Sequence, residues 1–201
     1  MILAERKIHV RRTAALAVAA LEESEKRCAD RSIAAALHSL DAYRASTQLL
    51  AYRPLPDEVD IVSLTDDAAR EGKAVFLPAA SEDGELHYRR WFPGDELVLS
   101  TLGVHEPIGG DPPGATPSLV LVPGRVFSVD GWRVGRGGGY YDRALSSLSR
   151  LGTTVGVAYS CQVVAHVPHG PGDERVHFVL SELGVGEGAT RAVARNVSPR
   201  S

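Results

Sequence analysis

The sequence contains only two cysteines, Cys28 and Cys161, and they lie far apart in a chain of 201 residues. Neither belongs to a CxxC motif. Disulfide-stabilised domains and zinc-binding modules depend on several cysteines at characteristic spacings. We therefore expect two reduced thiols in a cytosolic protein rather than a disulfide or zinc framework.

Long apolar runs are also missing, because no stretch approaches the roughly 20 residues needed to span a bilayer. The N-terminal region carries Glu5, Lys7 and Arg11, which does not fit the apolar core of a signal peptide. The formal net charge of −3 gives no overall attraction to nucleic acid. We expect a cytoplasmic monomer with neither a membrane nor a nucleic-acid partner.

Several common functional motifs are absent. The histidines form no HxxxH pair that would suggest zinc, and Ser128 and Ser160 lack the context of a hydrolase nucleophile. The Lys-Ser/Thr ending of the P-loop and the GxGxxG spacing of dinucleotide-binding folds are missing too. The two standard nucleotide fingerprints therefore do not apply.

What the sequence does have is a glycine-rich segment, RVGRGGGYYDR, at 133–143, shortly after an apolar strand that ends at Pro123-Gly124. Successive glycine N–H groups can form an anion-binding nest, and Arg133 and Arg136 beside it favour phosphate. Asp142 follows directly and is placed to hold a divalent cation against phosphates. These residues alone predict a basic nest. A turn that binds nothing, and an acid that only complements a helix dipole, stay open at this point.

Residues 122–145, VPGRVFSVDGWRVGRGGGYYDRAL, resemble the signature of the 5-formyltetrahydrofolate cyclo-ligase (methenyltetrahydrofolate synthetase) family. That signature is roughly an apolar strand, Pro-Gly, Phe, a turn, and R-x-G-x-G-x-G-Y-Y-D. The resemblance extends over about residues 3–184. Other segments similar to the family follow in the same order: Lys7 with Arg11, Asp57-Glu58, Phe76-Leu77-Pro78, Gly103 to Pro107 (GVHEP), Gly156 to Tyr159 with Gln162, and Val167-Pro168 with Asp173.

The resemblance implies a reaction that converts 5-formyltetrahydrofolate to 5,10-methenyltetrahydrofolate while ATP is split to ADP and phosphate. It implies ATP as co-substrate and Mg²⁺ as the metal. Transfer of the γ-phosphoryl group to the formyl oxygen would turn that oxygen into a phosphate leaving group, and N10 would attack the formyl carbon intramolecularly. The protein would mainly position groups and stabilise charge.

Roles in nucleotide and metal binding follow from the resemblance. Lys7 and Arg11 are four residues apart and share one helix face, which would otherwise be interpreted as a solvated basic face. Asp142 would ligate Mg²⁺, and Asp173 would assist. The residues implied to hold ATP are Lys7, Arg11, Arg133, Gly135, Arg136, Gly137, Gly138, Gly139 and Tyr141.

Roles in folate binding are implied for Glu58, Leu102 and Tyr140. Glu58 would accept hydrogen bonds from pterin N–H groups, and Tyr140 would lie against the pterin or formyl group. Arg136 and Tyr140 are the residues implied in catalysis. A surface acid at Glu58 and core aromatics at Tyr140 and Tyr141 are the alternatives.

The sequence departs from the family pattern at three positions. Gly138 stands where some members carry a second basic residue, and His177 stands where an acid is common. Leu102 replaces an aromatic residue, and Trp91 is a candidate to supply the missing stacking. Two other functions therefore stay open, a paralogue that uses ATP on another formyl or carboxyl substrate and a non-catalytic nucleotide-binding protein.

The order of periodic segments predicts an α/β fold, a three-layer α/β/α sandwich with a largely parallel central sheet. Ligands bind such sheets at the carboxyl ends of the strands. We expect a single domain over residues 1–185 and a flexible C-terminal tail over 186–201. Helices are expected at 2–22, 23–44, 57–69 and 140–151, and strands at 47–52, 74–77, 86–91 (an edge strand), 97–102, 118–122, 153–159 and 176–180.

Overall fold

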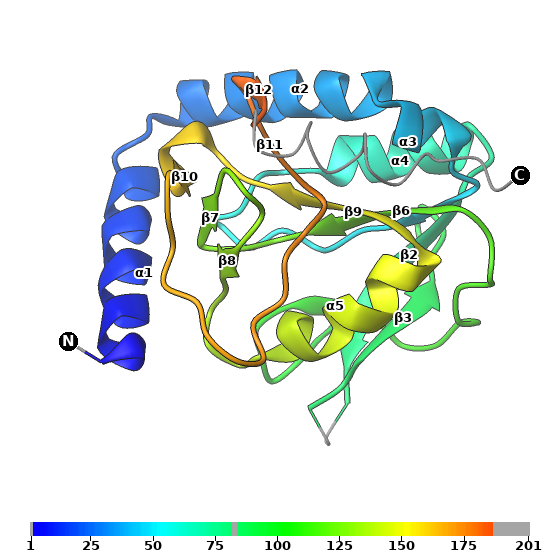
Figure 1. Ribbon diagram of the computed structural model, residues 1–201. Coiled ribbons are helices and arrows are strands. Elements are labelled where there is room, and N and C mark those ends of the chain that lie inside the picture. Colours follow the sequence, from blue (N-terminus) through cyan, green and yellow to red (C-terminus); the bar gives the residue numbers. More distant parts are fainter. Residues whose placement is uncertain (1, 82–83, 187–201) are drawn as a thin grey trace, which may run out of the picture.

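The computed structural model describes residues 2–81 and 84–186, and within these ranges the centre of the molecule is a seven-stranded sheet. Its strand order is β12-β11-β9-β6-β1-β2-β3 (Figure 1). The inner strands run parallel, whereas the edge strands β3 and β12 are antiparallel to their neighbours. The strands are β1 (Gln48–Leu50), β2 (Ala74–Ala80), β3 (Leu86–Arg90), β6 (Ser118–Val122), β9 (Gly152–Val157), β11 (Phe178–Ser181) and β12 (Gly184–Val185).

Helices cover both faces of this sheet, which confirms the three-layer α/β/α prediction. Because side chains alternate along a strand, neighbouring residues of β1 face opposite layers. Leu49 packs in the core with residues of α2 and α4, and Leu50 packs in the other core with residues of α5. The helices are α1 (Leu3–Ala19), α2 (Glu23–Ser39), α3 (Asp41–Ala45), α4 (Val62–Arg70), α5 (Tyr140–Leu151) and the short 3-10 helix η1 (Ser160–Gln162).

Local signals explain where several helices begin and end. The carboxylate of Asp60 accepts a hydrogen bond from the N–H of Val62 at the start of α4, and Gly72 follows the helix with a φ of +85°. The helix expected over 23–44 is instead two helices. Leu40 has extended backbone, with φ −67° and ψ 135°, and separates α2 from α3.

The predicted strands are present, but not all of them join the main sheet. The segment expected at 97–102 contributes β4 (Leu97–Leu99), which pairs with β5 (His105–Pro107) in a separate two-stranded sheet. A further small sheet was not predicted and has the order β10-β7-β8. Its strands are β7 (Val126–Ser128), β8 (Arg133–Val134) and β10 (Val163–Val164).

The single domain over 1–185 and the flexible tail over 186–201 stay predictions, because residues 187–201 lie outside the described part of the chain. Among residues 2–81 and 84–186, no helix combines the length and the apolar character needed to cross a membrane.

Candidate active site

A cavity of about 600 Å³ opens at the carboxyl ends of three neighbouring parallel strands, β2, β1 and β6. Tyr52 and Arg53 follow β1 and line it, Pro78 and Ala80 come from the end of β2, and Pro123-Gly124 follows β6. The chain leaves β1 and β6 toward opposite sides of the sheet, and such a switch point is the usual ligand position in doubly wound α/β folds. The location agrees with the sequence-based expectation.

The cavity brings together residues from distant parts of the chain. The helix α1, the segment after β1, the loop between β4 and β5, the glycine-rich segment and the loop before β11 all contribute. Every residue to which the sequence assigned a role lines this one cavity: Lys7, Arg11, Glu58, Leu102, Arg133, Gly135, Arg136, Gly137, Gly138, Gly139, Tyr140, Tyr141, Asp142 and Asp173. Their individual roles stay predictions.

The glycine loop, residues 135–139, runs from β8 to the first residue of α5, Tyr140. Gly137 has a φ of +114° and Gly139 a φ of +72°, which are conformations that favour glycine. The guanidinium of Arg11 donates a hydrogen bond from Nε to the Gly135 carbonyl at 2.7 Å and fastens the loop to α1. The positive end of the α5 dipole therefore faces the cavity, where it favours an anion.

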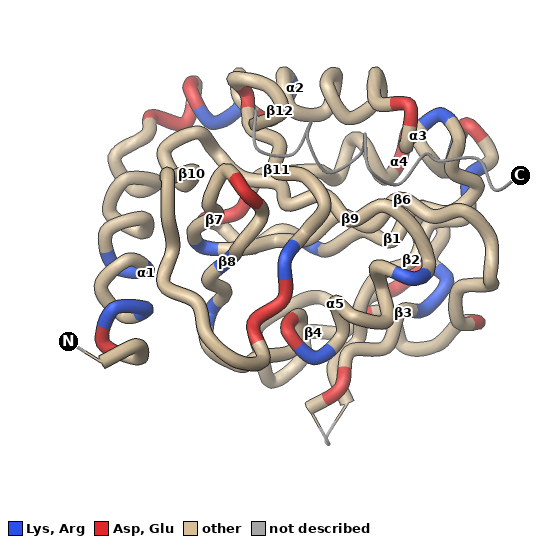
Figure 2. The backbone as a smooth tube through the Cα atoms, viewed as in Figure 1, with Lys and Arg blue, Asp and Glu red and all other residues tan. Residues whose placement is uncertain are grey.

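Two ion pairs stand at one end of the cavity. Lys7 Nζ lies 2.5 Å from Oδ1 of Asp173, and Nη2 of Arg133 lies 2.9 Å from Oδ1 of Asp142. Burial raises the pKa of Asp173, but hydrogen bonds from Lys7 and the Gly170 N–H outweigh it, so the pKa lies below its ordinary value. Figure 2 shows basic positions both on α1 and around β8, segments that lie near each other in the fold.

Arg133 is an unusually enclosed arginine, with a side chain that is 3% exposed. Its guanidinium lies 5.4 Å from the ring centroid of Tyr141 and forms an ion pair with Asp142. Tyr141 and Asp142 are consecutive residues in the first turn of α5. Burial lowers the pKa of Arg133, and the charge of Asp142 opposes that shift. Tyr141 lines the cavity and also packs against the core under α5, as the core-aromatic alternative expected. Its role in ATP binding stays a prediction.

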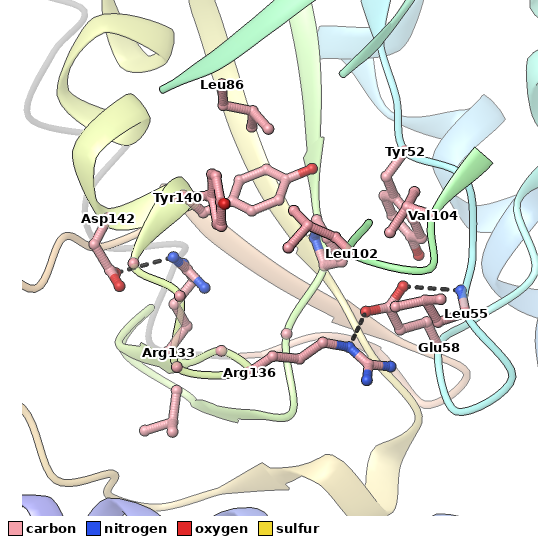
Figure 3. Close-up of a pocket in the computed structure, with 18 of the residues that line it drawn as sticks. Tyr52, Leu55, Glu58, Leu86, Leu102, Val104, Arg133, Arg136, Tyr140 and Asp142 are labelled. Carbon is pink, nitrogen blue, oxygen red and sulfur yellow. Dashed lines mark hydrogen bonds and ion pairs between the residues drawn. The ribbon is translucent and has the colours of Figure 1, made fainter. Parts of the chain in front are cut away.

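The other end of the cavity is mostly apolar and contains the carboxylate of Glu58 (Figure 3). Leu102 and Val104 lie between Tyr140 and Tyr52, and Leu86 lies above Tyr140. Glu58 accepts a hydrogen bond from the Leu55 N–H at 3.0 Å. A mostly apolar slot that contains a carboxylate suits a flat, mostly apolar ligand that has N–H donors at its edge.

Glu58 is buried, with a side chain that is 9% exposed. Burial raises its pKa above the ordinary value, while the Leu55 N–H and the charge of Arg136 act in the opposite direction. The alternative interpretation of Glu58 as a surface acid is therefore wrong.

Arg136 connects the two ends of the cavity. Its Nε lies 3.5 Å from Oε1 of Glu58, and its Nη2 contacts the carboxylate of Asp57. The side chain is 43% exposed, so a ligand can reach it. A partly exposed guanidinium between the glycine loop and an apolar slot can contact ligands on both sides.

The structure excludes the stacking role considered for Trp91 and shows what His177 contacts. Trp91 is 3% exposed and packs in the core, with the Arg53 guanidinium 4.7 Å from the centroid of its ring, so it does not replace the aromatic residue missing at Leu102. His177 Nδ1 lies 3.0 Å from the backbone N of Thr154 on β9, and burial lowers the pKa of the imidazole. His177 thus binds to β9 and is not among the residues that line the cavity.

The donor set fits a magnesium ion that is bound mainly through phosphate and water. Within the described ranges, 2–81 and 84–186, no group of three or more His, Cys, Asp and Glu side chains could enclose a metal. Asp142 and Asp173 line the same cavity as the glycine loop, and each is already paired with a basic residue. Mg²⁺ commonly takes one or two carboxylates and completes its octahedron with phosphate oxygens and water.

Several cavity residues escaped the sequence analysis. Arg53 and Leu86 carry no motif, and they reach the cavity only because segments that are distant in sequence lie side by side. Val104 belongs to the GVHEP segment. Glu106 is 8% exposed and accepts a hydrogen bond from the Ala80 N–H at 3.2 Å. It belongs to the GVHEP segment, so that motif was a signal that could have found it.

Comparisons with known proteins agree with this geometry. A family model described as the 5-formyltetrahydrofolate cyclo-ligase family matches residues 4–182. The 5-formyltetrahydrofolate cyclo-ligase of Escherichia coli K12 is 31% identical over 143 residues, which are 62% of this chain and 79% of that protein. The mouse protein of the same name is 28% identical over 153 residues, covering 70% of this chain and 75% of its own.

Solved structures show the same fold. The Aquifex aeolicus 5,10-methenyltetrahydrofolate synthetase superposes with a TM-score of 0.77 at 29% identity, covering 100% of this chain and 96% of that one. The Mycoplasma pneumoniae 5,10-methenyltetrahydrofolate synthetase has a TM-score of 0.70 at 22% identity, covering 88% and 98% of the two chains, and supports the fold alone.

Proposed function

The chain belongs to the 5-formyltetrahydrofolate cyclo-ligase family, and we propose that it converts 5-formyltetrahydrofolate to 5,10-methenyltetrahydrofolate with ATP and Mg²⁺. One observation carries the proposal beyond family membership. A basic glycine loop and an apolar slot with a buried acid open into a single cavity, so a nucleotide and a folate can be held against each other.

ATP would lie with its phosphates on the glycine loop. Lys7, Arg11 and Arg133 supply positive charge there, and the N-terminus of α5 adds its dipole. Lys7 and Arg133 are paired with Asp173 and Asp142 in the free protein. We expect these pairs to separate, so that the cations contact phosphate oxygens and the carboxylates are released to face the metal.

Asp142 and Asp173 are the residues that would hold Mg²⁺. An ion held by these two carboxylates would neutralise negative charge on the ATP phosphates. The protein's own residues do the remaining work, since they fix both substrates and exclude water from the transferred group.

The folate would lie in the slot between Tyr140 and Tyr52. Glu58 would accept hydrogen bonds from the pterin N–H groups, and Tyr140 would hold the formyl group close to the glycine loop. Arg136 reaches from the loop to Glu58. It would lie at the junction where the formyl oxygen meets the γ-phosphate.

The proposed chemistry has two steps. The formyl oxygen attacks the γ-phosphorus, and ADP leaves. The N10 amine then attacks the activated formyl carbon, its proton is lost, and the C–O bond breaks to release inorganic phosphate and the methenyl product. Because the second step is intramolecular, the held geometry of the folate lowers its barrier. Arg136 would balance the negative charge that moves between the two substrates.

Stoichiometry tests this function. ADP release should depend on added 5-formyltetrahydrofolate, with one ADP formed for each methenyl product. Release of ADP without folate, or with another formyl compound in its place, would instead favour a paralogue with a different substrate. ATP binding without any turnover would favour a non-catalytic protein.

We also propose that the chain acts as a monomer in the cytoplasm. The free thiols of Cys28 and Cys161 support a reducing compartment. Light scattering in solution tests the oligomeric state, and a mass of twice the chain would contradict it.

A further inference from the structure

Arg125 is held beside the glycine loop by backbone hydrogen bonds. It follows Pro123-Gly124, which lines the cavity, and its N–H donates to the Val134 carbonyl at 2.9 Å. The next residue after Val134 is Gly135, whose carbonyl accepts the hydrogen bond from Arg11. The turn before β7 therefore places Arg125 next to the point where α1 and the loop are joined.

The Arg125 side chain shares a carboxylate with Arg136. Both guanidiniums form ion pairs with Asp57, one with each carboxylate oxygen. The side chains of Arg125 and Asp57 are 21% and 23% exposed, so this bridge is partly withdrawn from water. One carboxylate thus holds two arginines in the free protein.

Positive charge is in excess at this point. The guanidiniums of Arg125, Arg136 and Arg11 lie close enough to affect one another. Burial lowers the pKa of Arg125, and the nearby charges of Arg136 and Arg11 lower it further. Asp57 and Glu58 are the acids that face them. A cluster of this kind favours an anion that carries several charges.

We propose that Arg125 is a further phosphate-binding residue, which exchanges Asp57 for the phosphates of ATP and joins Arg11 and Arg136 around them. The inference rests on the proposed function for the identity of the anion. Gly138 leaves the glycine loop without a second basic side chain, and Arg125 brings a cation to the same loop from the neighbouring turn. Asp57 is the internal anion that holds the arginines until the nucleotide arrives.

Binding measurements on the folded protein test the proposal. Arg125→Met and Arg125→Lys would be titrated calorimetrically with MgATP and, separately, with inorganic tripolyphosphate. We expect Arg125→Met to bind both ligands about 10- to 100-fold more weakly, as loss of a charge-assisted hydrogen bond predicts. Arg125→Lys should lose less, because it keeps the charge. Arg70→Met is the matched control, since it also removes an arginine paired with one aspartate but lies on α4.

The variant Asp57→Asn shows whether Arg125 binds phosphate or has a purely structural role. If Arg125 contacts phosphate, removal of the internal anion leaves the affinity for MgATP equal or higher. A loss as large as that of Arg125→Met would mean that the ion pair only supports the fold, and would overturn the proposal, as would unchanged affinity in Arg125→Met. Folate turnover is a separate readout: an Arg125-dependent ATP site without methenyl formation would leave this inference standing and remove the proposed function.

Discussion

Lys7 Nζ lies 2.5 Å and 2.6 Å from the two carboxylate oxygens of Asp173, although 166 residues separate them in sequence. This contact joins α1 to the loop before β11 and closes one end of the cavity. The sequence assigned one residue to phosphate and the other to metal. Their pairing in the free protein means that each keeps the other in place, and a bound MgATP would have to separate them.

Lys7→Met should weaken MgATP binding about 10- to 100-fold, because it removes a charged contact to phosphate. Arg6→Met is the matched control, since Arg6 is the exposed neighbour on another face of α1 and should leave the affinity unchanged. Calorimetric titration measures both. Equal affinities for the two variants would show that Lys7 does not contact the nucleotide.

The same substitution has a pH-dependent effect on stability. The pKa of Asp173 in the folded protein lies below its ordinary value of 3.8, so its ion pair stabilises the fold at neutral pH. That stabilisation disappears as the pH falls through the lowered pKa. The unfolding midpoint of Lys7→Met should therefore lie below that of the unaltered chain at pH 7, and the two midpoints should converge in acid.

Glu58→Gln should stabilise the fold while it weakens folate binding. Because burial raises the pKa of Glu58, the folded protein binds a proton more tightly than the unfolded chain, and ionisation at neutral pH costs stability. Stability contributed by the protonated acid is lost as the pH rises from the unfolded pKa through the raised pKa. The gain from Glu58→Gln should therefore be larger at pH 8 than at pH 4.

Thermal unfolding at the two pH values and the KM for 5-formyltetrahydrofolate measure the two effects of Glu58→Gln. Glu96→Gln, at an exposed acid, is the control for both. A variant with an unchanged KM for folate would contradict the role of Glu58 as a pterin acceptor, whatever its stability.

The fold could be predicted from the sequence wherever a strand was long enough to show its pattern. Ser118–Val122 is fully buried, and its apolar run identified it as a central strand. The small sheet escaped because its strands have only two or three residues, and Val163 pairs with Phe127 across a long stretch of chain. Pairing of that kind depends on tertiary contacts rather than on local sequence.

The site could be predicted because its chemistry is concentrated in one segment that resembles a known family. The glycine loop, its arginines and Asp142 all lie within 133–142. The bridge from Asp57 to Arg125 could not be predicted, because nothing in either local sequence shows that the turn after β6 lies against the segment after β1. For Trp91 the sequence predicted a contact that does not exist. It was a candidate to stack on the folate, but its side chain is buried in the core.

Gly139→Ala should weaken ATP binding as well as lower the stability of the fold. Gly139 has a φ of +72°, and a Cβ atom there would lie 2.7 Å from Nη1 of Arg143. Placing a side chain in this left-handed conformation costs about 1–2 kcal/mol. Gly94→Ala is the control, because Gly94 has a φ of +97° with open space around it. Both variants should lose stability, but only Gly139→Ala should raise the KM for ATP. Equal kinetics in the two variants would contradict a role of the loop geometry in binding.

Leu102→Trp should improve folate binding. Leu102 lines the cavity and is 47% exposed, so a larger ring can be added there without displacing the core. Stacking contributes about 0.5–1.5 kcal/mol, which corresponds to a KM for folate roughly 2- to 12-fold lower. Leu99→Trp, on the exposed strand β4, is the control. A higher KM in Leu102→Trp would mean that the folate does not pass between Tyr140 and Tyr52.

The proposed folate cyclo-ligase function is tested most directly by an absorbance assay for the methenyl product. The assay contains 5-formyltetrahydrofolate, ATP and Mg²⁺ and compares the unaltered chain with Asp142→Ala. Asp41→Ala is the control, because Asp41 is a fully solvated acid on α3. We expect product formation that requires both ATP and Mg²⁺, persists in Asp41→Ala and is nearly abolished in Asp142→Ala. Folded, ATP-binding protein that forms no methenyl product would contradict the folate cyclo-ligase function itself.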